Sequence, residues 1–173
     1  MTDRRLVLMR HGKAESFASN DHDRALTERG RRDVRSTGEH LAALGIVPDT
    51  ALISSSVRTV ETFQGAAEGA GWAVGWTSAV APDNGLYSGS STVLVAAIRE
   101  VPAGAGTVLY VGHNPTAAYV CHLLDDGVGD PDATNRLFHG FPTAAVAVLE
   151  VRVPWAELEE ESGRLVDFYV PRR

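Results

Sequence analysis

Two histidines and two arginines, widely separated in the sequence, each stand just after a short apolar run. They are Arg10, His11, Arg58 and His113. Arginine presents a planar fork of N–H donors that matches the oxygens of a phosphoryl group, and a neutral histidine can attack phosphorus. If the four side chains meet in space, they can bind a phosphoryl group and accept it covalently.

The elements that would position these residues alternate between apolar runs and helical patterns. Extended segments are predicted at 5–9, 51–53, 72–81, 107–111, 144–151 and 165–170. Helices are predicted from Thr27 to about 45, after Ser56 to 67, from 90 or 91 to 98, from 115 to 124, and over the short acidic run 155–161. Asp83 begins a turn with Asn84 and Gly85.

This alternation predicts an α/β fold, a three-layer α/β/α sandwich whose sheet is mostly parallel. In such sheets, ligands bind beyond the carboxyl ends of the strands. Arg10 and His11 follow the first predicted strand, Arg58 follows the second, and His113 follows the fourth. We therefore expect all four side chains to converge at one edge of the sheet.

Two of the four residues also stand beside helix N-termini. Arg58 lies in the first turn of its predicted helix, where the helix dipole disfavours a cation by about 0.3–1 kcal/mol. His113 precedes a helix that we expect Asn114 to cap, with Pro115 at its first position. Free N–H groups at a helix N-terminus bind anions, so both features predict a bound phosphate.

Composition narrows the possible functions and partners. The 173 residues fit a single domain over 1–173, and a net charge of −6 argues against a nucleic-acid partner. Cys121 is the only cysteine, so no intrachain disulfide can form. The apolar run 6–9 is too short for a signal peptide or a membrane span. We expect a cytoplasmic, monomeric protein without a membrane partner.

Several motifs identify the chain as resembling a known family. Residues 8–12 (LMRHG), 54–62 (SSSVRTVET) and 111–114 (VGHN) resemble the histidine phosphatase superfamily. Residues 10–15 (RHGKAE), 24–30 (RALTERG) and 86–87 (LY) are most similar to its SixA-like phosphohistidine phosphatases. The resemblance implies a mixed six-stranded sheet of the phosphoglycerate mutase-like fold.

The same resemblance implies roles for individual residues. His11 would be the nucleophile, and Arg10, Arg58 and His113 would complete the phosphate site. Gly12 and Asn114 would contribute to substrate binding. Arg24 either reaches the phosphate or the rim of the substrate site, or is a surface charge before a helix cap. Neither a cofactor nor a metal is implied.

The candidate proton donor differs from the family pattern. Superfamily members that cleave phosphate esters usually carry a carboxylic acid in the loop that corresponds to residues 81–87. The glutamate expected there, just before Leu86, is absent. Asp83 could replace it if the loop bends inward, although an Asp beside Asn-Gly is typical of a turn.

The missing acid bears on the substrate. An imidazole leaving group needs less protonation than an alkoxide. The absence of the acid therefore favours phosphohistidine in a protein over a small phosphomonoester. A small-molecule phosphomonoesterase and a non-catalytic phosphate-binding module remain alternatives. In each case the partner is a phosphorylated protein or a small phosphorylated substrate.

Other chemistry-bearing residues indicate no second site. The aspartate-rich run 125–132 lacks the glutamate of a calcium-binding EF-hand loop and is interpreted as a solvated loop. The remaining histidines have no metal-ligand spacing. Trp72, Trp76 and Trp155 are interpreted as packing residues.

Overall fold

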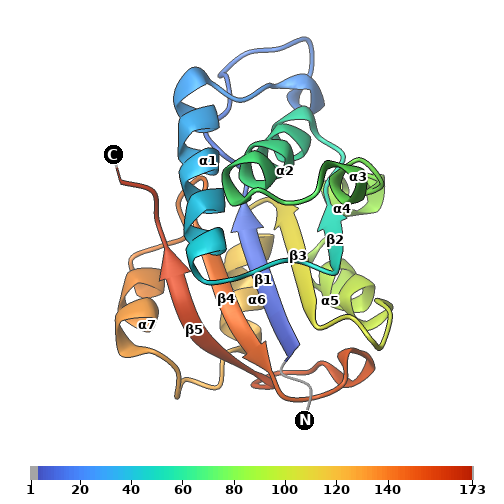
Figure 1. Cartoon of the computed structure of the whole chain (residues 1–173), viewed down its shortest axis with the longest axis vertical. Helices are drawn as coiled ribbons and strands as arrows, with labels where there is room; N and C mark the ends of the chain where they lie inside the picture. Colours follow the sequence, from blue (N-terminus) through green and yellow to red (C-terminus); the bar gives the residue numbers. More distant parts are fainter. Residues whose placement is uncertain (1–3, 173) are drawn as a thin grey trace.

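The computed structural model describes residues 4–172. Within them, the chain forms one five-stranded sheet with the order β2-β3-β1-β4-β5 (Figure 1). The strands are β1 (Arg4–Arg10), β2 (Thr50–Ile53), β3 (Thr107–Gly112), β4 (Val146–Val151) and β5 (Gly163–Tyr169). β1, β2 and β3 run parallel, and β4 is antiparallel to both of its neighbours. The mixed, mostly parallel sheet is as predicted.

Helices cover both faces of this sheet (Figure 1). One face carries α1 (Glu28–Ala43) and α2 (Val57–Ala70). The other face carries α5 (Ser91–Arg99), α6 (Thr116–Leu124) and α7 (Pro131–Phe138). Short elements complete the chain: η1 (Asp21–Asp23), α3 (Val74–Thr77), α4 (Asn84–Ser88) and η2 (Trp155–Glu157). The three-layer α/β/α arrangement is therefore confirmed.

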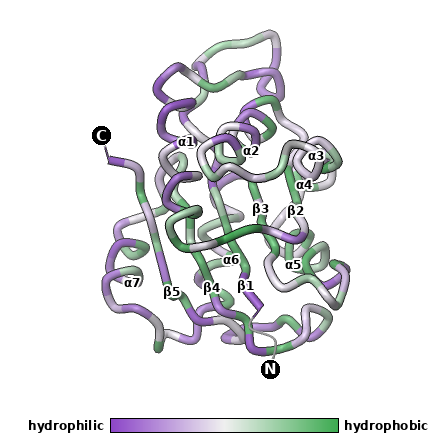
Figure 2. The backbone as a smooth tube through the Cα atoms, in the orientation of Figure 1, coloured by the Kyte–Doolittle hydropathy of each residue, from purple (hydrophilic) through white to green (hydrophobic). Residues whose placement is uncertain are grey.

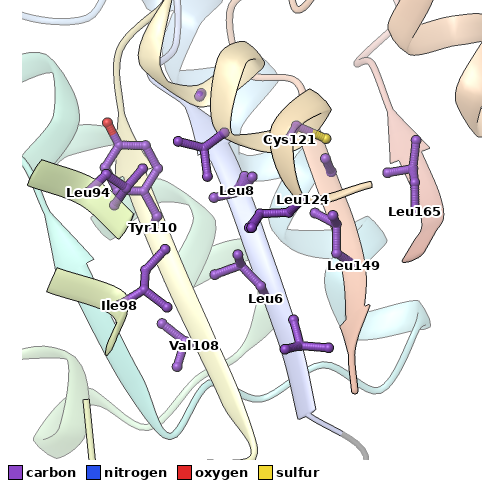
Figure 3. Close-up of a cluster of buried hydrophobic side chains, with 14 of the residues drawn as sticks. Leu6, Leu8, Leu94, Ile98, Val108, Tyr110, Cys121, Leu124, Leu149 and Leu165 are labelled. Carbon is purple, nitrogen blue, oxygen red and sulfur yellow. The ribbon is translucent and has the colours of Figure 1, made fainter. Parts of the chain in front are cut away.

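The central strand β1 supplies both halves of the core. Its side chains alternate between the two faces, as strand geometry requires. Leu6 and Leu8 pack among α5 and α6 (Figure 3), whereas Val7 and Met9 pack beneath α1 and α2. All four are fully buried. Hydrophobic residues accordingly run along the middle strands, and hydrophilic residues gather on the outer segments (Figure 2).

Helices α1 and α2 approach each other closely because glycine faces the contact. A Cβ atom on Gly38 of α1 would collide with the backbone of Ala66 in α2. Thr27 caps α1 as predicted, since its side chain accepts a hydrogen bond from the Gly30 N–H at 3.0 Å. The pair α1 and α2 thus forms a tight layer beside the loop that follows β1.

The segment 72–81 is not the strand that its sequence predicts. It contains the short helix α3 and turns, which gives five strands rather than six and makes β3 the strand before His113. Trp72 and Trp76 pack edge to face at 6.1 Å, and the Trp72 indole donates to the Ile46 carbonyl. Aromatic burial against α2 therefore replaces sheet pairing here.

Three further boundaries differ from the sequence predictions. Part of the aspartate-rich run begins a helix, because the Asp130 carboxylate caps α7 through the Ala133 N–H at 2.7 Å and Pro131 is at its first turn. The expected helix over 155–161 is only the single turn η2. Helix α6 begins at Thr116, with Pro115 rather than Asn114 at the N-cap.

Candidate functional site

The carboxyl ends of β1, β2 and β3 meet at one edge of the sheet, beneath the loop between β1 and α1 (Figure 1). Backbone hydrogen bonds continue the ladder past the strands. The His11 N–H donates to the Gly112 carbonyl at 2.9 Å, and the Ser54 N–H donates to the Val111 carbonyl at 3.1 Å. The three motifs that were distant in the sequence are therefore neighbours.

His11 is buried and held in one orientation. The residue is only 8% exposed, and its Nδ1 lies 2.7 Å from the Gly12 carbonyl oxygen. A carbonyl can only accept, so Nδ1 carries the proton and Nε2 keeps its lone pair. The orientation that a nucleophilic imidazole requires is thus fixed by the backbone.

Gly12 supports His11 through both of its polar backbone groups. Its carbonyl accepts from His11, and its N–H donates to Thr62 Oγ1 at 2.9 Å. A side chain on Gly12 would collide with Val34 of α1. The structure therefore places Gly12 as a support for the His11 ring, with neither polar group free for the substrate binding predicted from the sequence.

His113 faces His11 across the strand ends, with the ring centroids 5.4 Å apart. Its Nε2 lies 2.7 Å from the hydroxyl of Ser54, which is fully buried, and its Nδ1 lies 3.5 Å from an Arg58 nitrogen. A hydroxyl can donate or accept, so Ser54 supports either tautomer of the ring. The Arg58 guanidinium can only donate, so its contact places the lone pair on Nδ1; the other tautomer, which Ser54 also supports, would let Nδ1 donate to a phosphoryl oxygen instead.

Arg58 is buried in the first turn of α2 and is held by the loop that follows β1. Its Nη1 donates to the Asp21 carbonyl at 2.7 Å, and its Nη2 donates to the Asp21 carboxylate at 3.0 Å. The Arg58 Nε is buried and has no hydrogen-bond partner. Asp21 therefore offsets part of the unfavourable interaction between this cation and the helix dipole, and Nε keeps an unused donor.

Arg10 is fixed from the opposite side of the strand ends. Its Nη1 and the Asn114 side-chain amide both donate to the carbonyl oxygen of Phe141, at 2.9 and 2.8 Å. The Arg10 Nε, like that of Arg58, is buried without a partner. Asn114 thus positions the turn before α6 instead of capping the helix, with one of its two amide donors used and its Oδ1 buried without a partner.

Arg24 and Tyr87 join the same network through Asp21. The Arg24 Nε lies 3.3 Å from one carboxylate oxygen of Asp21, and the Tyr87 hydroxyl donates to the other at 2.8 Å. The hydrogen bond from Tyr87, followed by that from Arg58, lowers the pKa of Asp21. Arg24 therefore lies at the rim of the cluster, bound to the carboxylate that also holds Arg58.

Asp83 serves as a cap. Its carboxylate accepts from the Gly85 N–H at 2.7 Å and forms the N-cap of α4, while its backbone pairs with the residues after β2. The residue is exposed. The structure thus gives Asp83 the turn-forming role that its sequence context favours.

Burial and nearby positive charge keep both histidine rings neutral. Burial lowers the pKa of His11 to about 4, and the charges of Arg58 and Arg10 add to this effect. Burial and Arg58 likewise lower the pKa of His113 to about 4, against a raising effect of Asp21. At neutral pH His11 therefore carries a neutral imidazole, as nucleophilic attack requires.

The described part of the chain has neither a metal-binding cluster nor a helix that could span a membrane. Within residues 4–172, no group of three or more His, Cys, Asp or Glu side chains is arranged to hold a metal ion. None of the helices in that range combines the length and the apolar character needed to cross a membrane.

Comparison with known proteins identifies the class to which this fold and site belong. Residues 6–89 match the model of the histidine phosphatase superfamily (branch 1). A Mycobacterium leprae protein described as uncharacterized is 32% identical over 169 residues, which cover 95% of this chain and all of that protein. The chain belongs to the histidine phosphatase superfamily.

Solved structures place it more narrowly. A protein of Nakamurella multipartitia, provisionally named phosphohistidine phosphatase SixA, has a TM-score of 0.84 and 32% identity, over 99% of this chain and 98% of that chain. A protein of Agrobacterium tumefaciens with the same provisional name has a TM-score of 0.78 and 26% identity, over 99% and 100%. The chain therefore lies in the SixA-like branch.

Sequence reasoning missed three contributors to the site. Asp21 was not singled out because a polar loop gives no indication of where it folds back. Ser54 was noticed only as part of a motif, without its contact to His113. The Phe141 carbonyl, which holds Arg10 and Asn114, is a backbone group without a side-chain signature. Only the short Ser54-Ser-Ser56 run between strand and helix could have drawn attention to one of them.

Proposed function

We propose that this chain is a phosphatase that transfers a phosphoryl group from its substrate to His11 Nε2 and then hydrolyses the phosphohistidine. The observation that carries this proposal is the meeting of a neutral, backbone-oriented imidazole with two guanidiniums, that of Arg58 buried and that of Arg10 half-buried. Arg10 and Arg58 each keep a buried Nε–H without a partner. Buried donors of this kind require an acceptor, and the oxygens of a phosphoryl group can supply it.

The roles follow from the geometry. His11 Nε2 attacks phosphorus and the bond to the leaving group breaks. Arg10, Arg58 and His113 bind the equatorial oxygens, where negative charge is concentrated during transfer. Water then attacks the phosphohistidine, returning His11 and releasing inorganic phosphate.

We further propose that the substrate is a phosphohistidine carried by a protein. Two carboxylates near the strand ends are poorly prepared to protonate an alkoxide. The Asp21 pKa is lowered, so Asp21 is ionised at neutral pH, and the Asp83 carboxylate is committed to capping α4. An imidazole leaving group that already carries a proton does not need such a donor. The provisional names of the SixA neighbours support the same choice.

A trapping experiment tests the mechanism. The protein is mixed with ³²P-labelled phosphohistidine peptide, quenched in alkaline detergent and examined for covalent label that acid removes. Wild type and His122→Ala, which removes an exposed histidine, should both become labelled and release phosphate. His11→Ala should do neither. Label and turnover retained by His11→Ala would refute the mechanism, and binding without label in wild type would indicate a phosphate-binding module.

A further inference from the structure

The loop between β1 and α1 places a carboxylate at the outer edge of the catalytic cluster. The Asp21 side chain is 56% exposed, whereas the side chain of Arg58, to which it is bound, is 7% exposed. Asp21 therefore stands between the buried phosphate-binding groups and the solvent. A substrate whose phosphoryl group reaches Arg58 must bring its leaving group close to Asp21.

The Asp21 carboxylate has capacity for another donor. An ionised carboxylate offers about four acceptor positions. Two are taken in this structure, by the Arg58 Nη2 and the Tyr87 hydroxyl, while the Arg24 Nε forms an ion pair with the other oxygen at 3.3 Å without a hydrogen bond. These contacts keep the group ionised at neutral pH, and its exposure leaves room for an N–H from a substrate.

The surroundings of Asp21 suit a flat ring. The Tyr87 ring packs edge to face against His22 at 4.8 Å and against His113 at 5.8 Å. The His22 Nε2 is held by the Ser55 hydroxyl at 3.0 Å. An imidazole that leaves from the phosphoryl group would thus have aromatic neighbours at the same rim as the carboxylate.

Charge makes Asp21 decisive for a cationic leaving group. Arg24 and Arg58 face the rim from two elements, and together they would repel a second positive ring. Among residues 4–172, Asp21 is the carboxylate that pairs with both arginines, while Asp23 pairs with His22 in the same turn. Its removal would leave a more positive rim, which favours a phosphate dianion and disfavours a cation attached to it.

We propose that Asp21 is a specificity-determining residue that accepts a hydrogen bond from the protonated leaving group of an N-phosphorylated substrate, in particular from the imidazolium ring nitrogen that is not bonded to phosphorus. The inference rests on the proposed phosphatase function and adds the group that recognises its leaving group. It explains how the site handles a P–N bond without the carboxylic acid that ester-cleaving relatives use. Asp21 acts as an ionised acceptor, so it selects for leaving groups that bring their own proton.

The step is balanced without a further proton donor. The His11 Nε2 lone pair forms the new bond to phosphorus, and the P–N bond breaks with its electron pair going to the leaving nitrogen. The ring begins as a phosphorylated imidazolium with a proton on its other nitrogen and departs as neutral imidazole. Asp21 accepts a hydrogen bond from that N–H, which raises the pKa of the bound ring and keeps it in the reactive, protonated form.

The test compares two substrates in matched variants. The kcat/KM for a phosphohistidine peptide is divided by that for p-nitrophenyl phosphate, whose leaving group carries no positive charge. Asp21→Asn, which can still accept from Arg58 and Tyr87, should lower this ratio about tenfold, and Asp21→Glu should retain most of it. Asp23→Asn removes a charge from the same turn, where Asp23 contacts Asn20 and His22, and should leave the ratio within about twofold.

The pH profile gives a second readout, which a merely structural role would not change. In Asp21→Asn the alkaline limb for the phosphohistidine peptide should move to lower pH, since the bound ring loses its proton more easily. An unchanged ratio and an unchanged limb, with wild type active on the peptide, would overturn the inference and leave the proposed function intact. A wild type without activity on either substrate would refute the proposed function itself.

Discussion

At the scale of single residues, a buried hydroxyl fixes the orientation of the His113 ring. Ser54 is the hydrogen-bond partner of the His113 Nε2, and no part of Ser54 is exposed. A ring that turns away from the phosphoryl oxygens loses its contribution to the transition state. On the proposed mechanism, Ser54 is therefore a positioning residue that acts through His113.

Ser54→Ala should accordingly lower kcat about tenfold with little change in KM, because ring orientation is lost while Arg10 and Arg58 still bind phosphate. Ser56→Ala is the matched control, since Ser56 is equally buried but bonds to Thr59. Both variants should lose about 1 kcal/mol of unfolding free energy, the usual cost of one buried hydrogen bond. Equal kcat values in the two variants would contradict the positioning role.

The sequence predicted the convergence of the charged and nucleophilic side chains better than it predicted the residues that support them. His11, Arg58 and His113 could be brought together by one rule, that ligands bind where parallel strands end, because local apolar runs mark those ends. Asp21 could not, because its contact with Arg58 spans 37 residues and depends on how a polar loop folds back. The role of Gly12 likewise emerged only with the side chains around it.

At the scale of elements, the sequence predicted the strands and helices well where a long apolar run or a clear capping residue marks them. β1 and β3 are buried on both faces and read as continuous apolar runs, and Thr27 marks the start of α1 by its capping chemistry. The segment 72–81 was wrongly predicted as a strand because its two tryptophans, which pack against α2, are residues typical of strands. Helix α7 was missed because its aspartates read as solvated, although Asp130-Pro131 is a helix start.

The contact between α1 and α2 yields a prediction that opposes helix propensity. On propensity alone, Gly38→Ala should stabilise α1 by about 1 kcal/mol. In the folded protein the new Cβ would collide with the Ala66 backbone, so we expect a net loss of about 1–3 kcal/mol in urea unfolding. Gly104→Ala, where an added Cβ meets nothing within 4 Å, should not be destabilised. A stabilised Gly38→Ala would show that the helices are free to separate.

At the scale of the whole molecule, the site is a local concentration of positive charge on a chain whose net charge is −6. The fold buries Arg58 and His11 and half-buries His113, and the packing of the sheet against α1 and α2 must offset the cost of removing these groups from water. The free energy of this cluster is thus part of the stability of the entire fold. A change of pH acts on both at once.

The two neutral histidines predict how unfolding depends on pH. Their pKa values are about 4 in the folded protein, below the ordinary 6.5, so the unfolded chain takes up protons first as the pH falls. Their contribution is complete above pH 6.5 and is lost progressively down to about pH 4, at a limit of about 1.4 kcal/mol per pH unit for each ring.

Urea unfolding between pH 7.5 and 4.5 measures this loss, in a window above the range in which carboxylates such as Asp21 with a lowered pKa contribute. His11→Gln should show a shallower slope than wild type, and His11→Gln with His113→Gln a shallower slope still. Inorganic phosphate should also flatten the wild-type slope, because a bound dianion raises the pKa of both rings in the folded state. Identical slopes in wild type and the double variant would mean that these rings are not the groups that couple folding to pH.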